Sequence, residues 1–465
     1  MEQVNCSVSN ISEVLTDKDL RLEAGTFDKE AESAAVNVEH GKFPAVMFSE
    51  VAKYYMFGRS VKLMRTKSPY PFFQPSSVTD IKPVTDGYLY SSKQSEIDEL
   101  KIHEGQLLLS RSGTIGNVTY VSKTLRDKYL SPDMIRIDCN NPEDAGYIYA
   151  YLKSSEGQKI LHSLEFGAVI KHINPEHLQN IPVPNAPAEL RRKIHELVVK
   201  SYALRDESNI LLDEAESLLA SELRLPPIDE MKHDDGALIF SINGLDFVNS
   251  GRFEASYHDP LFVEIVRHLQ AEAEEVTTVG DKKVSKKVIL PGIFKRVYVE
   301  DEKHGAVFIG GKQISELDPA DKKFLAYSQH EKLINDVLII HENMILITCI
   351  GTVGKATLVP KHWEGWTVSQ NVMRIVPVSD DIAGYAYIFL GSEWGRSLIK
   401  RYSCGGVVEE VRDEHMKQVP FPFLKNKDAQ DKINSLALEA NSKRYEAYKL
   451  EREAMSIMEN EIISA

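Results

Sequence analysis

Apolar residues recur at every seventh position along two long stretches of the chain. In the first stretch, five leucines share one heptad position: Leu190, Leu197, Leu204, Leu211 and Leu218. The companion heptad position holds Ile194 and Ala215, but also Ser201 and Ser208. This spacing is typical of a coiled coil whose second seam is partly polar. It predicts one long helix over residues 187–224, since prolines stand at both ends of the pattern.

A second heptad pattern covers residues 424–465, again after two closely spaced prolines. Its two seams hold seven apolar residues: Ile433, Leu436, Ala440, Ala447, Leu450, Ala454 and Ile457. Lys443 interrupts one seam, and the alanines allow a partner helix to approach closely. Because each helix has a single apolar stripe, we expect the two helices to pair antiparallel with each other. Residues 188–223 as one helix would be roughly 54 Å long at about 1.5 Å per residue.

The patterns outside these helices occur twice. Residues 107–120 read LLLSRSGTIGNVTY, and 345–358 read ILITCIGTVGKATL, at an offset of 238 residues. In both copies an apolar, β-rich run precedes a glycine loop and an alternating run follows it, which predicts strand, turn and strand. The same register continues to the proline pairs at 182–184 and 420–422, through stretches of helical spacing. A repeat of this length indicates a duplicated domain.

The chain is therefore predicted to belong to the α+β class, with two duplicated mixed α/β globular domains joined by two long antiparallel coiled-coil helices in a pseudo-twofold arrangement. The predicted boundaries are 1–186 for the first domain, 187–224 for the first helix and 225–237 for a linker. The second domain covers 238–423, and the second helix covers 424–465.

Composition narrows the class of protein. The chain has 465 residues, of which 43% are hydrophobic and 27% charged, as in ordinary globular proteins. No apolar run is long enough to span a membrane, and the four cysteines have neither metal-ligand nor disulfide spacing, so we expect a cytoplasmic protein. The formal net charge of −14 argues against a general nucleic-acid binder. Any DNA-binding role must therefore depend on local basic patches.

Each domain has one such patch at the same place in its sequence. Residues 51–67 contain five basic residues and no acid: Lys53, Arg59, Lys62, Arg65 and Lys67. Residues 282–298 contain six and no acid: Lys282, Lys283, Lys286, Lys287, Lys295 and Arg296. Aromatic residues alternate with these cations, as in many nucleic-acid surfaces. The alternative interpretation is a solvated face.

The glycine loops carry further hydrogen-bond donors that could reach DNA: Ser110, Arg111, Thr114, Thr348 and Thr352. The loops could cradle a phosphate through backbone amides, or they could be hairpin turns that pack within each domain. No phosphate loop, zinc-protease helix, nucleophile elbow or aminomethyltransferase motif is present in the sequence. His177 and His415 occupy matching positions without a second ligand, so we expect neither a metal site nor a catalytic residue.

Together these motifs resemble the specificity subunit of Type I restriction-modification systems. Each half combines an Arg-[Leu/Phe]-Glu-Ala stretch, at 21–24 and 252–255, with a GTxG hairpin, a [Val/Ile]-Pro-x-Pro turn and a long helix. The resemblance implies that each domain is a target recognition domain that reads half of a bipartite site in double-stranded DNA. It also implies that the helices set the spacing between the half-sites and dock two methyltransferase subunits, with restriction and translocase subunits added to the complex. S-adenosylmethionine, ATP and Mg would then belong to those partners, and this chain would be non-catalytic.

The repeat departs from strict matching at Arg111, whose counterpart is Cys349. A difference of this kind is expected if the two domains read unlike half-sites. The competing hypothesis is a two-headed protein-protein scaffold without sequence-specific DNA binding. An unrecognised nuclease or methyltransferase is the third hypothesis, and it has no motif in its favour.

Overall fold

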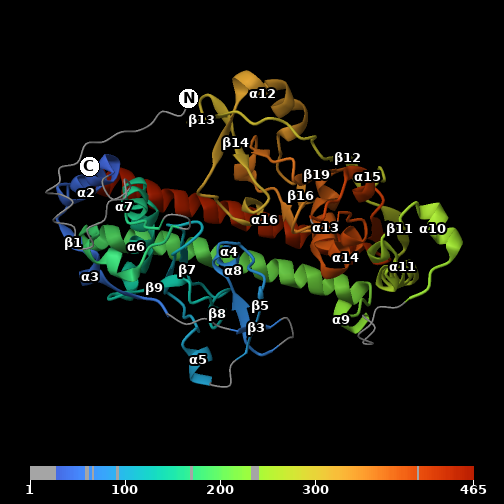
Figure 1. Cartoon of the computed structure of the whole chain (residues 1–465), viewed down its shortest axis with the longest axis horizontal. Helices are drawn as coiled ribbons and strands as arrows, with labels where there is room; N and C mark the ends of the chain where they lie inside the picture. Colours follow the sequence, from blue (N-terminus) through green and yellow to red (C-terminus); the bar gives the residue numbers. More distant parts are fainter. Residues whose placement is uncertain are drawn as a thin grey trace. The chain divides into compact units, whose positions relative to one another are not determined.

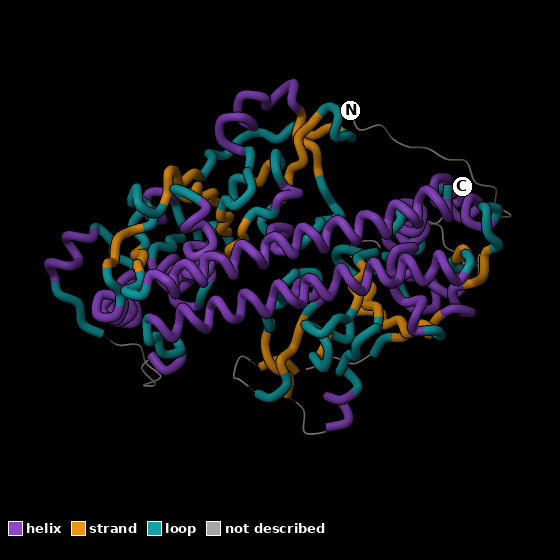
Figure 2. Tube along the Cα trace, turned by 180° about the vertical axis from the view of Figure 1, so that it is seen from behind, coloured by secondary structure: helices purple, strands orange, loops and turns teal. Residues whose placement is uncertain are grey.

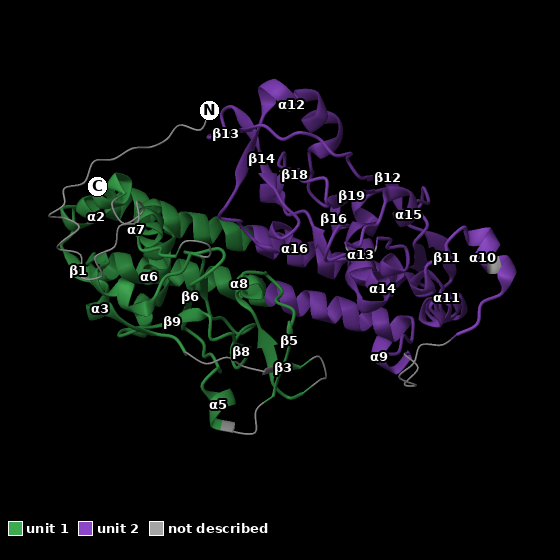
Figure 3. Ribbon diagram, in the orientation of Figure 1, with its two compact units in different colours: residues 1–206, 446–465 green, residues 207–445 purple. Residues whose placement is uncertain are grey.

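The computed structural model describes residues 28–57, 62–64, 68–90, 94–167, 171–231, 240–405 and 408–464. The chain forms two compact units (Figures 1 and 3): unit 1 contains residues 1–206 and 446–465, and unit 2 contains residues 207–445. Each unit thus includes part of both long helices. The predicted boundaries, which assign the helices to segments of their own, stay a prediction.

Unit 1 contains three small sheets. In the first, β2, β9, β6 and β7 are neighbours in that order, and all pairs are antiparallel: β2 Ala52–Tyr55, β9 Met134–Cys139, β6 Leu107–Ser110 and β7 Val118–Tyr120. The second sheet has the order β3-β5-β4-β8: β3 Lys62–Met64, β5 Gly87–Tyr90, β4 Pro71–Phe73 and β8 Tyr129–Leu130. The third pairs β1 Ala45–Met47 with β10 Pro182–Pro184.

Helices accompany these sheets throughout unit 1 (Figure 2). They are α2 Lys29–Glu39, α3 Phe48–Val51, α4 Pro75–Val78, α5 Gln94–Asp98, η2 Pro142–Asp144, α6 Ala145–Lys153, α7 Ser155–Ser163 and η3 Pro175–Asn180.

Unit 2 repeats the topology of unit 1. Its sheets have the orders β12-β19-β16-β17, β13-β15-β14-β18 and β11-β20. The strands are β11 Glu275–Thr278, β12 Ser285–Ile289, β13 Tyr298–Val299, β14 Gly305–Ile309, β15 Lys323–Ala326, β16 Ile345–Thr348, β17 Ala356–Leu358, β18 Thr367–Val368, β19 Val372–Pro377 and β20 Pro420–Phe423. The α-helices of this unit outside the long pair are α9 Ile228–Met231, α10 Gly244–Ser250, α11 Pro260–Glu272, α12 Tyr327–Leu333, α13 Asp380–Gly391, α14 Glu393–Arg401 and α15 Asp413–Met416. The predicted fold, two duplicated mixed α/β domains, is confirmed.

The apolar runs before the glycine loops form strands that are buried on both faces. In β6, Leu107 and Leu109 belong to one core cluster and Leu108 to another. In β16, Ile345 and Ile347 belong to one cluster and Leu346 to another. Successive side chains of a strand point to opposite faces, so each of these strands lies between two layers of core. This is why successive residues of β6 and β16 are hydrophobic and do not alternate with polar residues.

Matching glycines bring one short helix of each unit against a long helix. A Cβ on Gly146 of α6 would lie 2.7 Å from Cα of His195, and one on Gly384 of α13 would lie 2.3 Å from the backbone oxygen of Asn434. The amide of Gly146 donates to Nδ1 of His195 at 3.1 Å, and that of Gly384 donates to Oδ1 of Asn434 at 2.8 Å. Only glycine permits this backbone approach.

The two long helices are α8 Ala188–Glu222 and α16 Lys427–Ile457, the latter followed by a π-helical turn, η8 Met458–Ile463. Three contacts within unit 2 give their direction. Glu207 contacts Lys443 at 2.8 Å, Glu214 contacts Lys432 at 2.7 Å, and Asn426 donates to Glu222 at 3.3 Å. Residue numbers on α16 fall as those on α8 rise, so the predicted antiparallel pairing is confirmed.

The predicted seam of the first helix needs correction. The heptad leucines Leu190, Leu197, Leu204, Leu211 and Leu218 are only half-buried. The companion heptad position, with Ile194, Ser201, Ser208 and Ala215, is fully buried as predicted, and Val198, Leu212 and Leu219 are buried as well. The helix packs against the core of a domain as well as against its partner helix, and this turns its buried face away from the leucines. In the second helix Leu450 is likewise half-buried, whereas Ile433, Leu436, Ala440, Ala447, Ala454 and Ile457 are buried as predicted.

Candidate nucleic-acid interface

A β-bulge in unit 2 exposes two consecutive lysines. The pairing of β12 with β19 shifts register between Ser285 and Lys287. Side chains along a regular strand alternate between faces, but a bulge re-aims one of them. Ser285 and Val288 are therefore buried while both Lys286 and Lys287 are exposed.

The connection after β12, residues 290–297, adds a row of cations and aromatic rings. Lys295 and Arg296 are exposed, and a guanidinium nitrogen of Arg296 donates to Oε1 of Gln370 at 2.7 Å. The guanidinium carbon lies 5.4 Å from the centre of the Phe308 ring. The ring of Tyr298, 5.9 Å from that of Phe308, has Nζ of the exposed Lys323 5.2 Å from its centre.

Arg296, Tyr298 and Lys323, which lie around the buried ring of Phe308, form together with Lys286, Lys287 and Lys295 what is called the unit 2 basic surface below. Cations beside aromatic rings suit both phosphate contact and stacking. Lys323 was missed in the sequence because it lies far from residues 282–298 and reaches Tyr298 only through the pairing of β13 with β15. The acidic turn at 300–302 is exposed as well and adjoins β13.

The two remaining predicted lysines of unit 2 differ from each other. Lys282 is exposed. Lys283 contacts both carboxylate oxygens of Glu275, at 2.7 and 2.8 Å, and hydrogen bonding to this carboxylate raises the pKa of Lys283. The charge of Lys283 is thus matched within the domain, which makes it a weaker candidate for DNA contact than Lys286.

The basic segment of unit 1 has the equivalent topological position. It links β2 of the first sheet to β3 of the second, as residues 290–297 link β12 to β13. Lys53 is exposed on β2, and Lys62 begins β3 opposite Tyr90. Arg59, Arg65 and Lys67 lie outside the described residues.

The glycine loops are hairpin turns, as the strand, turn and strand pattern predicted. Gly113 and Gly351 both have φ of 79°, a left-handed conformation that favours glycine. The amides of Gly351 and Gly354 donate to backbone oxygens of Glu409 and Thr348, at 3.0 and 2.9 Å. Because these amides are engaged inside the domain, the structure favours the packing turn over the phosphate cradle.

The donors predicted around these loops fall into two groups. Thr114 and Thr352 are exposed at the loop tips. Ser110 and Thr348 are buried at strand ends, and the hydroxyl of Thr348 donates to the backbone oxygen of Thr352. Arg111 is half-buried and donates to Asp133 at 2.9 Å and Asn174 at 3.2 Å. Burial and internal pairing argue against DNA contact by Ser110, Thr348 and Arg111, because strand pairing turns these side chains inward.

Two matching arginines are fully buried and serve the fold. Arg136 of β9 donates to the backbone oxygens of Met134 and Leu130, at 3.4 and 3.3 Å. Arg374 of β19 donates to three backbone oxygens, including that of Val372 at 2.9 Å. Burial lowers the pKa of Arg136 to about 10 and that of Arg374 to about 9. Neither guanidinium is presented to solvent.

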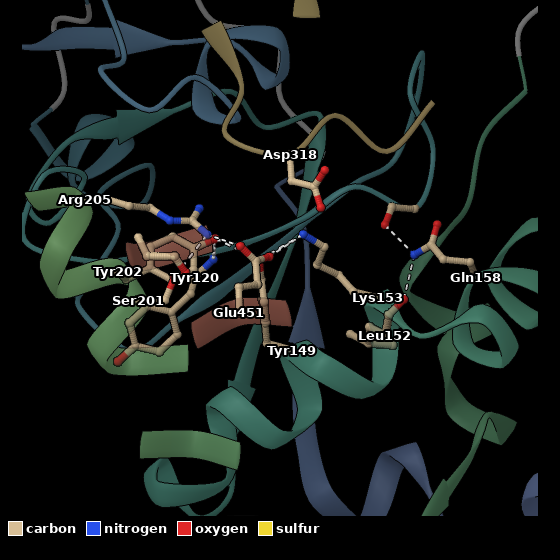
Figure 4. A network of polar contacts seen from close by, with 12 residues as sticks. Tyr120, Tyr149, Leu152, Lys153, Gln158, Ser201, Tyr202, Arg205, Asp318 and Glu451 are labelled. Carbon is tan, nitrogen blue, oxygen red and sulfur yellow. Dashed lines mark hydrogen bonds and ion pairs between the residues drawn. The ribbon is translucent and has the colours of Figure 1, made fainter. Parts of the chain in front are cut away.

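A buried polar cluster in unit 1 was not predicted. The carboxylate of Glu451 on α16 accepts hydrogen bonds from Nζ of Lys153 at 2.6 Å, from the hydroxyl of Tyr149 at 2.5 Å and from Arg205. Figure 4 shows Lys153 and Arg205 pointing toward Glu451 from different helices. Burial alone would raise the pKa of Glu451, but the charges of Lys153 and Arg205 hold it well below its usual range. The cluster holds α6, α8 and α16 together.

The described residues hold no group of three or more side chains of the kind that binds a metal ion. His415 stacks on Tyr402, and burial lowers the pKa of His415. Among the helices of the described ranges, none is both long enough and apolar enough to cross a membrane.

The comparisons with known proteins agree with the sequence motifs. Residues 49–198 match the family model of the Type I restriction modification DNA specificity domain. A search of curated proteins found no match.

Solved structures of specificity subunits are also similar over most of the chain. One is a Type I restriction-modification system S subunit from M. genitalium, with 12% identity, 90% of this chain and 95% of that chain covered, and a TM-score of 0.31. Another is the HsdS subunit from Thermoanaerobacter tengcongensis, with 11% identity, coverage of 91% and 99%, and a TM-score of 0.28. Scores this low carry no argument, so the similarity rests on the match over 49–198. Residues 49–198 are therefore similar to the Type I restriction modification DNA specificity domain, in agreement with the resemblance that the repeated motifs indicated.

Proposed function

We propose that this protein is a DNA specificity subunit that reads a bipartite site in double-stranded DNA, with one half-site for each unit. The observation that carries the proposal is the equivalent position of the two basic segments. Each links the two four-stranded sheets of its unit, and in unit 2 the link presents exposed cations beside aromatic rings. Phosphate contacts from such cations position a protein on the duplex, and neighbouring side chains can then read base edges.

The long helices have a separate role in this proposal. The contacts of Glu207 and Glu214 with lysines of α16 support a fixed helix register, and a fixed register would hold the spacing between half-sites. The helices would also dock two methyltransferase subunits, and restriction and translocase subunits would complete the complex. S-adenosylmethionine, ATP and Mg would act in those partners. This chain would contribute recognition and no catalytic residue.

Footprinting the complex with its methyltransferase partner tests the bipartite reading. Two protected patches at fixed spacing are the expected result, and methylome sequencing of a host that carries the system should report the same two half-sites. Protection without sequence preference would refute the proposal.

Charge removal tests the unit 2 basic surface. Lys286→Gln combined with Lys287→Gln should weaken DNA binding and reduce the salt slope of log K by roughly 1.8, at about 0.9 for each lost phosphate contact. The matched control is Lys432→Gln, since Lys432 is also exposed but pairs with Glu214 on the helices. An unchanged slope in the double variant would mean that the two lysines form only a solvated face.

A protein-protein scaffold is the second candidate, and one observation favours it. Three large apolar side chains near α10 are strongly exposed: Leu245, Val248 and Phe253. Exposed apolar groups close together are frequent at protein interfaces. Tight binding to the methyltransferase partner without a footprint on DNA would support this candidate.

A further inference from the structure

Ile293 is more exposed than any other large apolar side chain in the described parts of the chain. Its relative exposure is 93%, compared with 75% for Val248. Single exposed apolar residues are common, so exposure alone carries no conclusion. The surroundings of Ile293 are what distinguish it.

The segment around Ile293 is anchored on both sides. Pro291 is buried, and Phe294 packs against a core cluster that includes Phe308 and Leu325. The ring centre of Phe294 also lies 5.6 Å from that of His330. Between these anchors, only Gly292 and Ile293 project. A Cβ added at Gly292 would meet no atom within 4 Å.

The apolar tip belongs to the same connection as two cations of the unit 2 basic surface. Lys295 and Arg296 follow it by two and three residues, and the bulged strand that carries Lys286 and Lys287 precedes it. Cations of this kind position a protein on phosphates, and an apolar side chain among them can reach the one apolar group on a base edge in the major groove. That group is the C5 methyl of thymine.

We propose that Ile293 is a specificity-determining residue that contacts the C5 methyl group of a thymine in the half-site read by unit 2. The proposal rests on the proposed DNA-reading function. Ile293 acts as an anchored apolar tip, while the surrounding cations supply most of the affinity.

Methyl deletion on the DNA tests this contact. Each thymine of the unit 2 half-site is replaced in turn by deoxyuridine, which lacks only the methyl group, and affinity is measured for the complex with its methyltransferase partner. We expect one position to cost about fourfold in affinity, the value of one buried methyl group at about 0.8 kcal/mol. For the variant Ile293→Ala, thymine and deoxyuridine at that position should bind equally.

The control is Val263→Ala, which removes an exposed aliphatic side chain from α11 of the same unit. It should keep the fourfold difference. Equal urea midpoints by tryptophan fluorescence would establish that both variants are folded.

The outcomes separate the two proposals. A wild-type complex without sequence preference refutes the DNA-reading function itself. Sequence preference with the same deoxyuridine response in Ile293→Ala, or a unit 2 half-site without thymine, overturns the role of Ile293 alone. Unstacking of a 2-aminopurine reporter that depends on Ile293 would also overturn it, because a wedge between bases does not read the methyl group. So would loss of binding to anionic lipid vesicles in Ile293→Ala with DNA reading unchanged.

Discussion

Replacing Gly384 with alanine should destabilise unit 2, although alanine is the better helix former. The added Cβ would lie 2.3 Å from the backbone oxygen of Asn434 and 3.0 Å from Cβ of Ala437. A carbon and a carbonyl oxygen normally approach no closer than about 3.3 Å. The overlap of roughly 1 Å is with helix backbone, so α13 must move away from α16.

Three terms give the magnitude. Overpacking of this kind costs about 1–3 kcal/mol. Moving α13 also stretches two hydrogen bonds to Oδ1 of Asn434, from the amides of Gly384 at 2.8 Å and Tyr385 at 3.1 Å. Each contributes about 1 kcal/mol. The higher helix propensity of alanine offsets about 1 kcal/mol. The expected net loss in the free energy of unfolding is about 2–4 kcal/mol.

Tryptophan fluorescence during urea unfolding measures this loss in the correct unit. All three tryptophans of the chain, Trp363, Trp366 and Trp394, lie in unit 2. With a urea slope of about 2–3 kcal/mol per M, the midpoint should fall by about 1 M. The control is Gly391→Ala in the same helix, where the added Cβ would meet Ala356 at an ordinary 3.6 Å. An unchanged or higher midpoint for Gly384→Ala would refute the close backbone contact of α13 with α16.

The remaining predictions concern the buried cluster, the basic surface and the helices. Glu451→Gln should destabilise unit 1 by about 3 kcal/mol, because it leaves the half-buried cations Lys153 and Arg205 without a carboxylate. Hydrogen exchange of α6 should report the loss, and Tyr149→Phe should cost only about 1 kcal/mol. Because the folded pKa of Glu451 is depressed, its stabilisation is complete above the unfolded pKa of about 4.3 and is lost as pH falls toward the folded pKa. Acid unfolding of unit 1 should therefore depend less on pH in Glu451→Gln, and an equal dependence would contradict the cluster. Lys323→Gln should reduce the salt slope of DNA binding by about 0.9, and no change would exclude a phosphate contact. Deleting one heptad from each of α8 and α16 should shorten the spacer in the methylome motif, and a change in half-site bases would count against a helical spacer.

The duplication and the strand, turn and strand units could be predicted because they depend on hydrophobic runs and glycines that are close together in the sequence. The runs at 107–109 and 345–347 are apolar at every position, and the structure places them between two core layers. Direction of helix pairing also followed from the sequence, since each helix had one apolar stripe. These properties depend on neighbours close in the chain or on an internal repeat in constant register.

The partners of the buried polar residues on the long helices could not be predicted in the same way. Ser201 is fully buried, and its hydroxyl donates to the backbone oxygen of Ala447 at 2.8 Å. Glu451 is buried because two cations from other helices neutralise it. A heptad count ranks positions by hydrophobicity alone, so it favours leucines over polar residues whose partners come from distant segments.

In the candidate interface, too, some features depend on residues close in the sequence and others on strands far away in it. The clustering of lysines in 282–298 was visible in the sequence, but the bulge that exposes both Lys286 and Lys287 depends on pairing with β19. Lys323 joins the surface only through β13 and β15. Exposure of Ile293 depends on the anchoring of Pro291 and Phe294, which no spacing rule encodes.

If the two units read unlike half-sites, the side chains that they offer to DNA must differ. Arg111 and Cys349 are one mismatched pair of the repeat, but Cys349 is fully buried and Arg111 is paired with Asp133 inside its domain. Their difference therefore changes packing and not the surface offered to DNA. Matched contacts persist elsewhere in the interior, since Tyr147 and Tyr385 donate to equivalent proline oxygens before the long helices. Because the interior is shared, the connections between the two four-stranded sheets are the segments that can differ between the units. In unit 2 this connection carries exposed cations and the apolar tip. We therefore expect the residues of these connections to determine which half-site each unit prefers. The glycine hairpin that reveals the duplication is expected to stabilise the fold.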